Sequence, residues 1–305
     1  MRVLLFGSNG QLGSDLSRVF GAAGDKIVAM THADVDICSG ERVAEVIADS
    51  KPEVVLNTTA FHKVEECETK PDRAFQVNSS AAMNLALACK KADAVLVHFS
   101  TDYVFGGYLK NAPYEETDRI APLNVYGVSK AAGEALIACN SRRYFTVRTS
   151  GLYGIAGSSG KGGNFVENML KKALLGEAIR VVDDQVLTPT YTVDLARAVR
   201  KLILTENFGL YHISSEGECS WHEFTRYIFE TAGVDAKLSG IKTGTMSSPV
   251  NRPFYSVLSK RKLQALGIAM PSWQDAMCRY LEEKRHARLA GQLFTNNRCA
   301  LKSEA

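Results

Sequence analysis

Residues 3–13 decide the fold, and they read Val3-Leu4-Leu5-Phe6-Gly7-Ser8-Asn9-Gly10-Gln11-Leu12-Gly13. A short apolar run is followed by three glycines in the spacing G-x-x-G-x-x-G, and then by apolar residues at helical spacing up to Ala22. Glycines at such a turn let the backbone bend sharply and approach a pyrophosphate, while the next helix offers its N-terminal N–H groups to the phosphates. We therefore predict a strand, a dinucleotide-binding turn and a helix.

The same alternation continues beyond this turn. The apolar runs expected to form strands are Ile27 to Met30, Val54 to Asn57, Val95 to Phe99 and Tyr144 to Val147. The stretches expected to form helices include Pro71 to Lys91 and Leu123 to Ala138. Continuous apolar strands separated by helices predict a parallel sheet that is buried on both faces. The expected fold class is α/β, with a doubly wound sheet of the Rossmann type.

The pattern changes after about residue 150. We predict a dinucleotide-binding domain over residues 1–150, with 186–206 packing back on it, and a smaller α+β substrate-binding lobe over 151–185 and 207–290. In this lobe we expect helices at Asn164 to Leu175, Ser220 to Ala232 and Trp273 to Leu289, and strands at Ile179 to Val182 and Leu210 to Ile213. Residues 291–305 are polar, so we expect a loose tail.

Composition narrows the class of ligand. Lys plus Arg is 36 and Asp plus Glu is 33 in 305 residues, so the net charge of +3 gives no electrostatic footprint for nucleic acid or an anionic membrane. No apolar run reaches the roughly 18 residues of a transmembrane helix, and no H-E-x-x-H or C-x-x-C spacing suggests a metal. Seven scattered cysteines favour a reduced, cytoplasmic protein. The sequence allows a homodimer but does not set the oligomeric state.

The end of the second strand bears on the cofactor. It reads Met30-Thr31-His32, without the acid that would bind the ribose 2′-OH of NAD and repel a 2′-phosphate. The first acid is Asp34. This favours NADPH, with NADH left open. His32 is a candidate neighbour of the phosphate, and the alternative that it is an ordinary surface residue stays open too.

A second constellation suggests acid catalysis. Thr101 lies at the end of the fourth strand, and Tyr126 and Lys130 are four residues apart in an expected helix, which puts them on one face. A cation beside a tyrosine favours the tyrosinate and lowers a pKa that is normally about 10. We predict that Lys130 acts on Tyr126 in this way, so that Tyr126 can protonate a carbonyl oxygen to which Thr101 also donates. The alternative interpretation of Y-x-x-x-K is an amphipathic helix face.

These motifs resemble the extended short-chain dehydrogenase/reductases, and among them the dTDP-4-dehydrorhamnose reductase family. The resemblance covers about residues 1 to 285 and is most specific in Ser100-Thr101-Asp102-Tyr103-Val104-Phe105. It also rests on Pro122-Leu123-Asn124-Val125-Tyr126-Gly127 and on Arg252-Pro253. It implies reduction of the C4 carbonyl of dTDP-4-dehydro-β-L-rhamnose by NAD(P)H.

The resemblance also implies roles for single residues. Tyr126 would protonate the C4 oxygen, with Lys130 and Thr101 as the other catalytic residues, and Thr101, Asp102 and Arg252 would contact the substrate. Besides Tyr126 and Lys130, the implied cofactor-binding residues are Gly7, Asn9, Gly10, Gln11, Leu12, Gly13, His32, Asp36, Ile37, Thr59, Ala60, Phe61 and Asn78.

Departures from the family pattern leave alternatives. Gly151 stands where the family often has Trp, which leaves the exact sugar open. A reductase or epimerase of another nucleotide sugar is one alternative. A non-catalytic regulatory subunit, similar to the beta subunit of methionine adenosyltransferase, is another. A 4,6-dehydratase is disfavoured because Tyr103, not Glu, follows Asp102.

Overall fold

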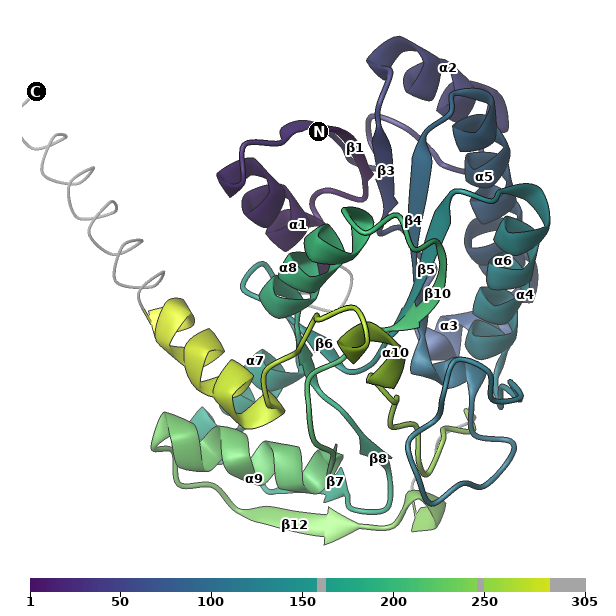
Figure 1. The fold of residues 1–305 in the computed structure, drawn as a ribbon. Coiled ribbons are helices and arrows are strands. Elements are labelled where there is room, and N and C mark those ends of the chain that lie inside the picture. The colour runs from purple at the N-terminus through teal and green to yellow at the C-terminus, as the bar shows by residue number, and fades with distance from the viewer. Residues whose placement is uncertain (158–162, 246–249, 286–305) are drawn as a thin grey trace, which may run out of the picture.

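The computed structural model describes residues 1–157, 163–245 and 250–285, and it has a parallel sheet at its centre (Figure 1). The sheet has six strands in the order β10-β5-β4-β3-β1-β2, and every neighbouring pair is parallel. Its strands are β1 (Arg2–Phe6), β2 (Lys26–Met30), β3 (Val54–Asn57), β4 (Val95–Thr101), β5 (Tyr144–Thr149) and β10 (Gly209–His212). β2 lies on one side of β1 and the other strands on the opposite side, so the strand order reverses beside β1, where such folds bind ligands.

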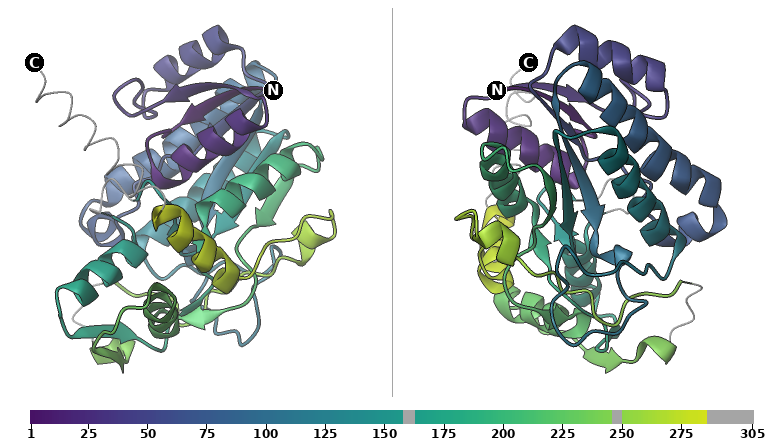
Figure 2. Two further views of the ribbon diagram at one scale, coloured as in Figure 1. Left: turned by 90° about the vertical axis from the view of Figure 1, so that its left-hand side faces the viewer. Right: turned by 45° about the vertical axis from the view of Figure 1, so that its right-hand side comes forward.

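Helices cover both faces of this sheet, as Figure 2 shows from two sides. One face packs against α1 (Gln11–Ala22) and α8 (Thr192–Ile203). The other packs against α2 (Gly40–Ser50), α5 (Ala81–Lys91) and α6 (Val125–Asn140). The doubly wound α/β fold is therefore confirmed, and α8 packs with α1 on the same face of the sheet.

The long helix expected over Pro71 to Lys91 is interrupted. It consists of α4 (Pro71–Phe75), a π-helical turn (Gln76–Ser80) and α5. A short helix, α3 (Val64–Thr69), precedes it. π-turns inside helices occur frequently at functional sites. This one carries Asn78, which lies behind the candidate site described below.

The smaller lobe combines helices with two-stranded sheets. Its helices are α7 (Phe165–Leu174), α9 (Trp221–Ala232) and a helical segment at 273–285, whereas α10 (Arg261–Gln264) packs on the core of the central sheet through Leu263. Its strands are β6 (Leu152–Tyr153), β7 (Ile179–Val182), β8 (Val186–Leu187), β9 (Thr190–Tyr191), β11 (Cys219–Ser220) and β12 (Leu238–Ile241), and short 3-10 turns cover Asp102–Val104 and Thr243–Thr245. An aromatic cluster around Tyr153, Phe224 and Trp273 forms its core. The mixed α+β content matches the expectation.

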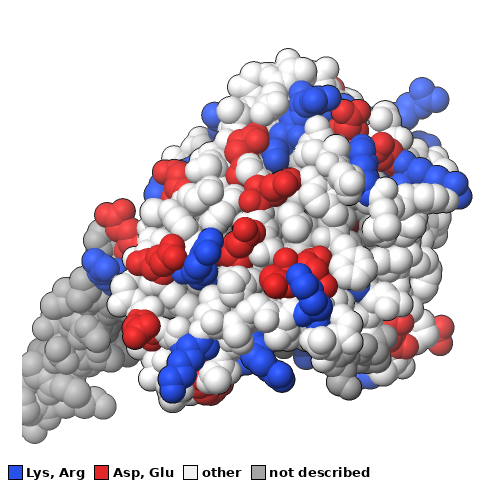
Figure 3. Space-filling model, turned by 90° about the horizontal axis from the view of Figure 1, so that it is seen from below, with Lys and Arg blue, Asp and Glu red and all other residues white. Residues whose placement is uncertain are grey.

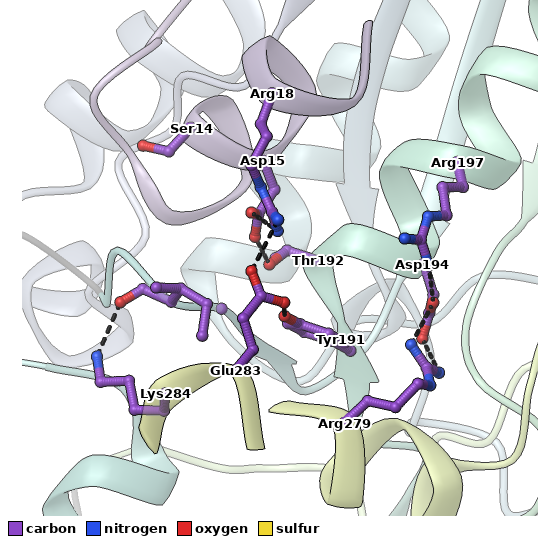
Figure 4. A network of polar contacts seen from close by, with 12 residues as sticks. Ser14, Asp15, Arg18, Tyr191, Thr192, Asp194, Arg197, Arg279, Glu283 and Lys284 are labelled. Carbon is purple, nitrogen blue, oxygen red and sulfur yellow. Dashed lines mark hydrogen bonds and ion pairs between the residues drawn. The ribbon is translucent and has the colours of Figure 1, made fainter. Parts of the chain in front are cut away.

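A polar network fixes the 273–285 helix to the first domain (Figure 4). Glu283 accepts a hydrogen bond from the Tyr191 hydroxyl at 2.6 Å and pairs with Arg18 of α1 at 2.7 Å. Arg279 makes a two-point contact with the buried Asp194 of α8, at 2.9 and 2.6 Å. Bidentate pairs of this kind fix geometry as well as charge. The two lobes are thus held together by ion pairs on α1 and α8.

One predicted placement was wrong. The strand expected at Leu210 to Ile213 was assigned to the smaller lobe, but β10 pairs in parallel with β5 and completes the central sheet. The division into lobes otherwise stays a prediction. The tail at 291–305, the end of the helix expected to reach Leu289, and most of the loop at 157–163 lie outside the described residues.

The surface carries both signs of charge. On the face seen in Figure 3, Lys and Arg side chains are interspersed with Asp and Glu. Within the described ranges, no helix is long and apolar enough to cross a membrane.

Candidate active site

A cleft of about 1490 Å³ lies at the carboxyl ends of β1, β3, β4 and β5 and extends to the smaller lobe. A pocket for one small ligand typically measures about 300–1,000 Å³, so this cleft has room for two. Every site residue predicted from the sequence lines it, with the exception of Asn78. Asn78 lies behind the wall, where its Oδ1 accepts from the Phe61 N–H at 2.9 Å and its Nδ2 donates to the Phe61 carbonyl at 3.0 Å. It therefore braces the cleft.

The glycine turn forms one end of the cleft. Gly7 has φ +79°, a left-handed conformation that favours glycine. A Cβ on Gly13 would lie 2.1 Å from the Gly7 carbonyl oxygen, so only glycine lets α1 start this close to β1. Gly10 is the N-cap of α1 and has no side chain to cap the helix. The first N–H groups of α1 are thus left without a side-chain cap, as an anion-binding helix end requires.

Thr101 and Tyr126 come together at the floor of the cleft. Burial raises the pKa of the Tyr126 hydroxyl, and a hydrogen bond with Thr101 partly offsets this rise. The Tyr126 ring also meets the Tyr103 ring edge-on, with centroids 5.9 Å apart. The Tyr126 hydroxyl therefore carries its proton at neutral pH, which is the state that a proton donor needs.

The pKa of Tyr126 is raised, whereas we expected Lys130 to lower it. The buried Lys130 amine donates to the Phe99 carbonyl at 2.6 Å and lies 3.1 Å from the His98 ring. Burial lowers the pKa of Lys130 to about 8, with Glu134 opposing. Burial is thus the largest influence on both groups: it raises the pKa of Tyr126 and lowers that of Lys130.

Asp102 is held by three hydroxyls. Its Oδ1 accepts from Thr101 at 3.1 Å, and its Oδ2 accepts from Ser150 at 2.8 Å and from Ser256 at 2.6 Å. Burial raises the pKa of Asp102, and these hydrogen bonds oppose the rise. Asp102 lines the cleft as predicted for a substrate contact, but its oxygens are largely occupied by the chain itself. In the structure its Oδ1 fixes the direction of the Thr101 hydroxyl.

A buried ion pair lies beneath Thr101. Arg148 of β5 donates to Glu134 of α6 through two nitrogens, at 2.9 and 2.7 Å, and both side chains are nearly inaccessible to water. Ser100 donates to the same carboxylate. With Ser100, the pair ties β5 to the end of β4 and to α6, the two elements that carry the candidate catalytic groups.

The end of the cleft away from the glycine turn is suited to a second ligand. Arg252 lines it and pairs with Glu65 of α3. Trp221, at the start of α9, also lines it and packs on Phe165 with ring centroids 4.5 Å apart. Gly151 lies in this wall at φ +55°, and a Cβ there would come within 2.9 Å of Leu187. The aromatic surface on this side therefore comes from Trp221.

Several residues at the site escaped sequence reasoning. Arg73 of α4 lines the cleft near Asp36 and His32. His98 sits within the apolar run of β4 and contacts Lys130. A lone histidine in a continuous apolar strand was a signal that could have found it. In the described ranges, no group of three or more His, Cys, Asp or Glu side chains could hold a metal ion.

Comparisons with known proteins agree with this geometry. The family described as RmlD substrate binding domain matches residues 1–286. The spore coat polysaccharide biosynthesis protein SpsK of Bacillus subtilis is 40% identical over 286 residues, which cover 94% of this chain and 99% of that protein. The dTDP-4-dehydrorhamnose reductase of Shigella flexneri is 34% identical over 93% of this chain and 98% of its own.

A solved structure is also similar to this chain. The dTDP-4-dehydrorhamnose reductase of Bacillus anthracis, crystallised in complex with NADP, is 36% identical and superposes with a TM-score of 0.87. The match covers 92% of this chain and 99% of that one. The similarity extends over both lobes and the cleft between the strand ends and α9.

Proposed function

This chain belongs to the RmlD substrate binding domain family, and from that premise we propose that it reduces dTDP-4-dehydro-β-L-rhamnose to dTDP-β-L-rhamnose with NADPH. One observation supports this most strongly: Thr101, Tyr126 and Lys130 line the same cleft as the glycine turn. An acid and a dinucleotide cradle in one cavity are what reduction of a carbonyl requires. The chain is then an oxidoreductase of sugar-nucleotide and cell-surface polysaccharide biosynthesis.

The residues present fit a nicotinamide dinucleotide. Gly7 and Gly13 let the turn and the start of α1 pack tightly at the end of β1, and the N-terminus of α1 has no side-chain cap. The buried Oε1 of Gln11 has no hydrogen-bond partner among the described residues. When bound, the reduced nicotinamide supplies the hydride that the reaction needs.

The chain's own groups supply the proton and the geometry. Tyr126 holds a proton at its hydroxyl and would pass it to the C4 oxygen of the sugar. Thr101 would turn its one hydroxyl proton, which in the structure is donated to Asp102, toward the same oxygen. Tyr126 and Thr101 would then place two hydrogen-bond donors where negative charge develops in the transition state. Lys130, one turn along α6 from Tyr126, would bind the cofactor and restore the Tyr126 proton.

Substrate recognition would fall to the far end of the cleft. A planar guanidinium suits a diphosphate, and Arg252 is the residue we assign to it. The Glu65 carboxylate pairs with this arginine at the edge of the cleft. Trp221 would form the apolar wall that the family often builds with the residue at the position of Gly151.

NADPH preference gives a specific expectation. Arg73 would pair with the 2′-phosphate, because it lines the cleft near the end of β2, beside His32 and Asp36. We expect Arg73→Gln to raise the KM for NADPH about tenfold, the scale of one lost charge-assisted hydrogen bond, and to leave that for NADH nearly unchanged. Arg42→Gln, which removes an exposed arginine of α2 paired with Glu45, is the control.

Steady-state kinetics with both cofactors measures this. A wild-type enzyme with the higher kcat/KM for NADH would contradict the assignment. So would an Arg73→Gln variant that loses activity with both cofactors equally.

Two finer expectations remain proposals. A cytoplasmic location is supported by the free thiols of Cys38, Cys89, Cys139, Cys219 and Cys278. A homodimer is one oligomeric state to test, and light scattering of the purified chain distinguishes it from a monomer.

A turnover assay tests the proposed function against its alternatives. The purified chain is incubated with dTDP-4-dehydro-β-L-rhamnose and NADPH, and cofactor oxidation and product are followed together. We expect one equivalent of NADPH oxidised for each dTDP-β-L-rhamnose formed. An epimerase would convert sugar without net NADPH oxidation, and a regulatory subunit would do neither.

A further inference from the structure

A chain of buried polar groups runs behind the cleft, from β3 through β4 to α6. It links Thr59, Asn57, His98 and Lys130, and the last three of these side chains are inaccessible to water. Buried polar groups need defined donors and acceptors, because each unmatched group costs desolvation free energy. The protonation of every member can therefore be worked out from its neighbours.

The orientation of Asn57 comes first. Its Oδ1 accepts from the Thr59 backbone N–H at 3.1 Å and from the Thr59 hydroxyl at 2.6 Å. A backbone N–H can only donate, so the atom facing it must be the amide oxygen. The Asn57 Nδ2 consequently faces His98 Nδ1 at 3.0 Å, and it donates there.

This donor fixes the tautomer of His98. Because Nδ1 accepts, the neutral ring must carry its proton on Nε2. Burial keeps the pKa of His98 well below its usual value, so the ring is neutral. Its Nε2–H points at the Lys130 Nζ, 3.1 Å away.

An ammonium group has three donors and no acceptor, so it cannot receive this N–H. A neutral amine can, through its lone pair, while one of its own N–H groups donates to the Phe99 carbonyl at 2.6 Å. The two titratable side chains that act on Lys130 among the described residues are His98 on β4 and Glu134 on α6. Glu134 favours the ammonium, but it is already paired with Arg148.

We propose that His98, held by Asn57 in the Nε2–H tautomer, is a positioning residue that stabilises the neutral form of Lys130. The inference rests on the proposed function for its role in turnover. Tyr126 gives its proton to the C4 oxygen and becomes a tyrosinate. Lys130 then gives up a proton to restore Tyr126, the resulting amine accepts the His98 N–H, and a solvent proton later restores the ammonium. His98 makes this release of the proton easier.

The tautomer of His98 can be measured on the purified chain alone, without substrate, cofactor or an activity assay. Long-range ¹⁵N–¹H NMR at pH 9, above the pKa of about 8 for Lys130, reports which ring nitrogen carries the proton. We expect Nε2–H for His98. His212 is the internal control, because its Nδ1 faces the Tyr114 carbonyl at 3.1 Å and must therefore be protonated. An Nδ1–H or doubly protonated His98 would overturn the proposal. The signal of His98 is identified as the one that disappears in the His98→Gln variant.

The Asn57→Asp variant should reverse the tautomer of His98, because it puts an acceptor where Asn57 has a donor. A carboxylate oxygen in place of Nδ2 accepts from His98 Nδ1–H, so Nε2 becomes an acceptor and stabilises the Lys130 ammonium. We expect the His98 tautomer to switch while that of His212 stays. The alkaline limb of the kcat profile, where the proton source is lost, should move up by at least about one pH unit, a tenfold change in the protonation equilibrium.

The possible results distinguish a failure of the proposed role of His98 from a failure of the proposed function. A switched tautomer with an unmoved or lowered alkaline limb would overturn the role of His98 in turnover. If the chain reduces no nucleotide sugar, the proposed function fails, while the NMR measurement still decides the state of His98. If Asn57→Asp does not fold, the wild-type tautomer alone carries the test.

Discussion

Tyr126→Phe should lower kcat by about 10²-fold or more, the usual scale of general acid catalysis, while NADPH still binds. The reason is that the hydroxyl of Tyr126, which lines the cleft and is hydrogen-bonded with Thr101, is the acid we assign. Phenylalanine keeps the ring and its edge-on contact with Tyr103, so the fold should be unchanged. Steady-state kinetics, with cofactor binding followed by fluorescence, measures both effects.

Tyr103→Phe is the matched control. It removes a hydroxyl from a second tyrosine that lines the same cleft and touches the first ring. Burial raises the pKa of Tyr103 to about 12, and no acid role is assigned to it. We expect its kcat to stay within about tenfold of wild type, below the range of acid catalysis. Near-full turnover by Tyr126→Phe would remove Tyr126 from the mechanism.

Arg148→Met should reduce the free energy of unfolding by about 3–5 kcal/mol, the cost of leaving one partner of a buried ion pair alone. Glu134 would remain as a carboxylate without its two-point partner, with 9% of its side chain exposed. Denaturant unfolding of the purified chain measures the change. Replacing Glu134 with Met as well should recover much of the loss, since apolar residues of similar size often substitute for buried pairs.

Arg143→Met is the control for this effect. Arg143 stands near the start of β5 and pairs with Asp93, but the side chains are 40% and 85% exposed. An exposed pair contributes about 0–1 kcal/mol, so this variant should unfold almost like the wild type. Equal losses in Arg148→Met and Arg143→Met would show that burial of the Glu134 pair has no special weight.

Local motifs predicted the parts of this site that depend on short sequence spacing. The turn from Gly7 to Gly13 follows from a strand and a helix that adjoin in sequence, and the Tyr126 to Lys130 spacing follows from one helix. These elements could be interpreted without knowing the rest of the chain. The fold class followed from the same local alternation of apolar strands and helices.

Long-range pairings were the part that sequence reasoning missed. The partners of His98 come from β3 and α6, and neither is near it in sequence. β10 was assigned to the wrong lobe because its partner, β5, lies far back in the chain. The pKa of Tyr126 was expected to fall because a lysine is nearby, but burial of the hydroxyl is a property of the whole cleft.

Transfer of deuterium from [4-²H]NADPH tests the central claim most directly. The label must be on the face of the nicotinamide that delivers the hydride, so both stereoisomers are used in parallel with dTDP-4-dehydro-β-L-rhamnose. We predict that one isomer gives dTDP-β-L-rhamnose with deuterium at C4, seen by NMR and mass spectrometry. A product without deuterium at C4 from either isomer, or a product of another configuration at C4, would contradict the account.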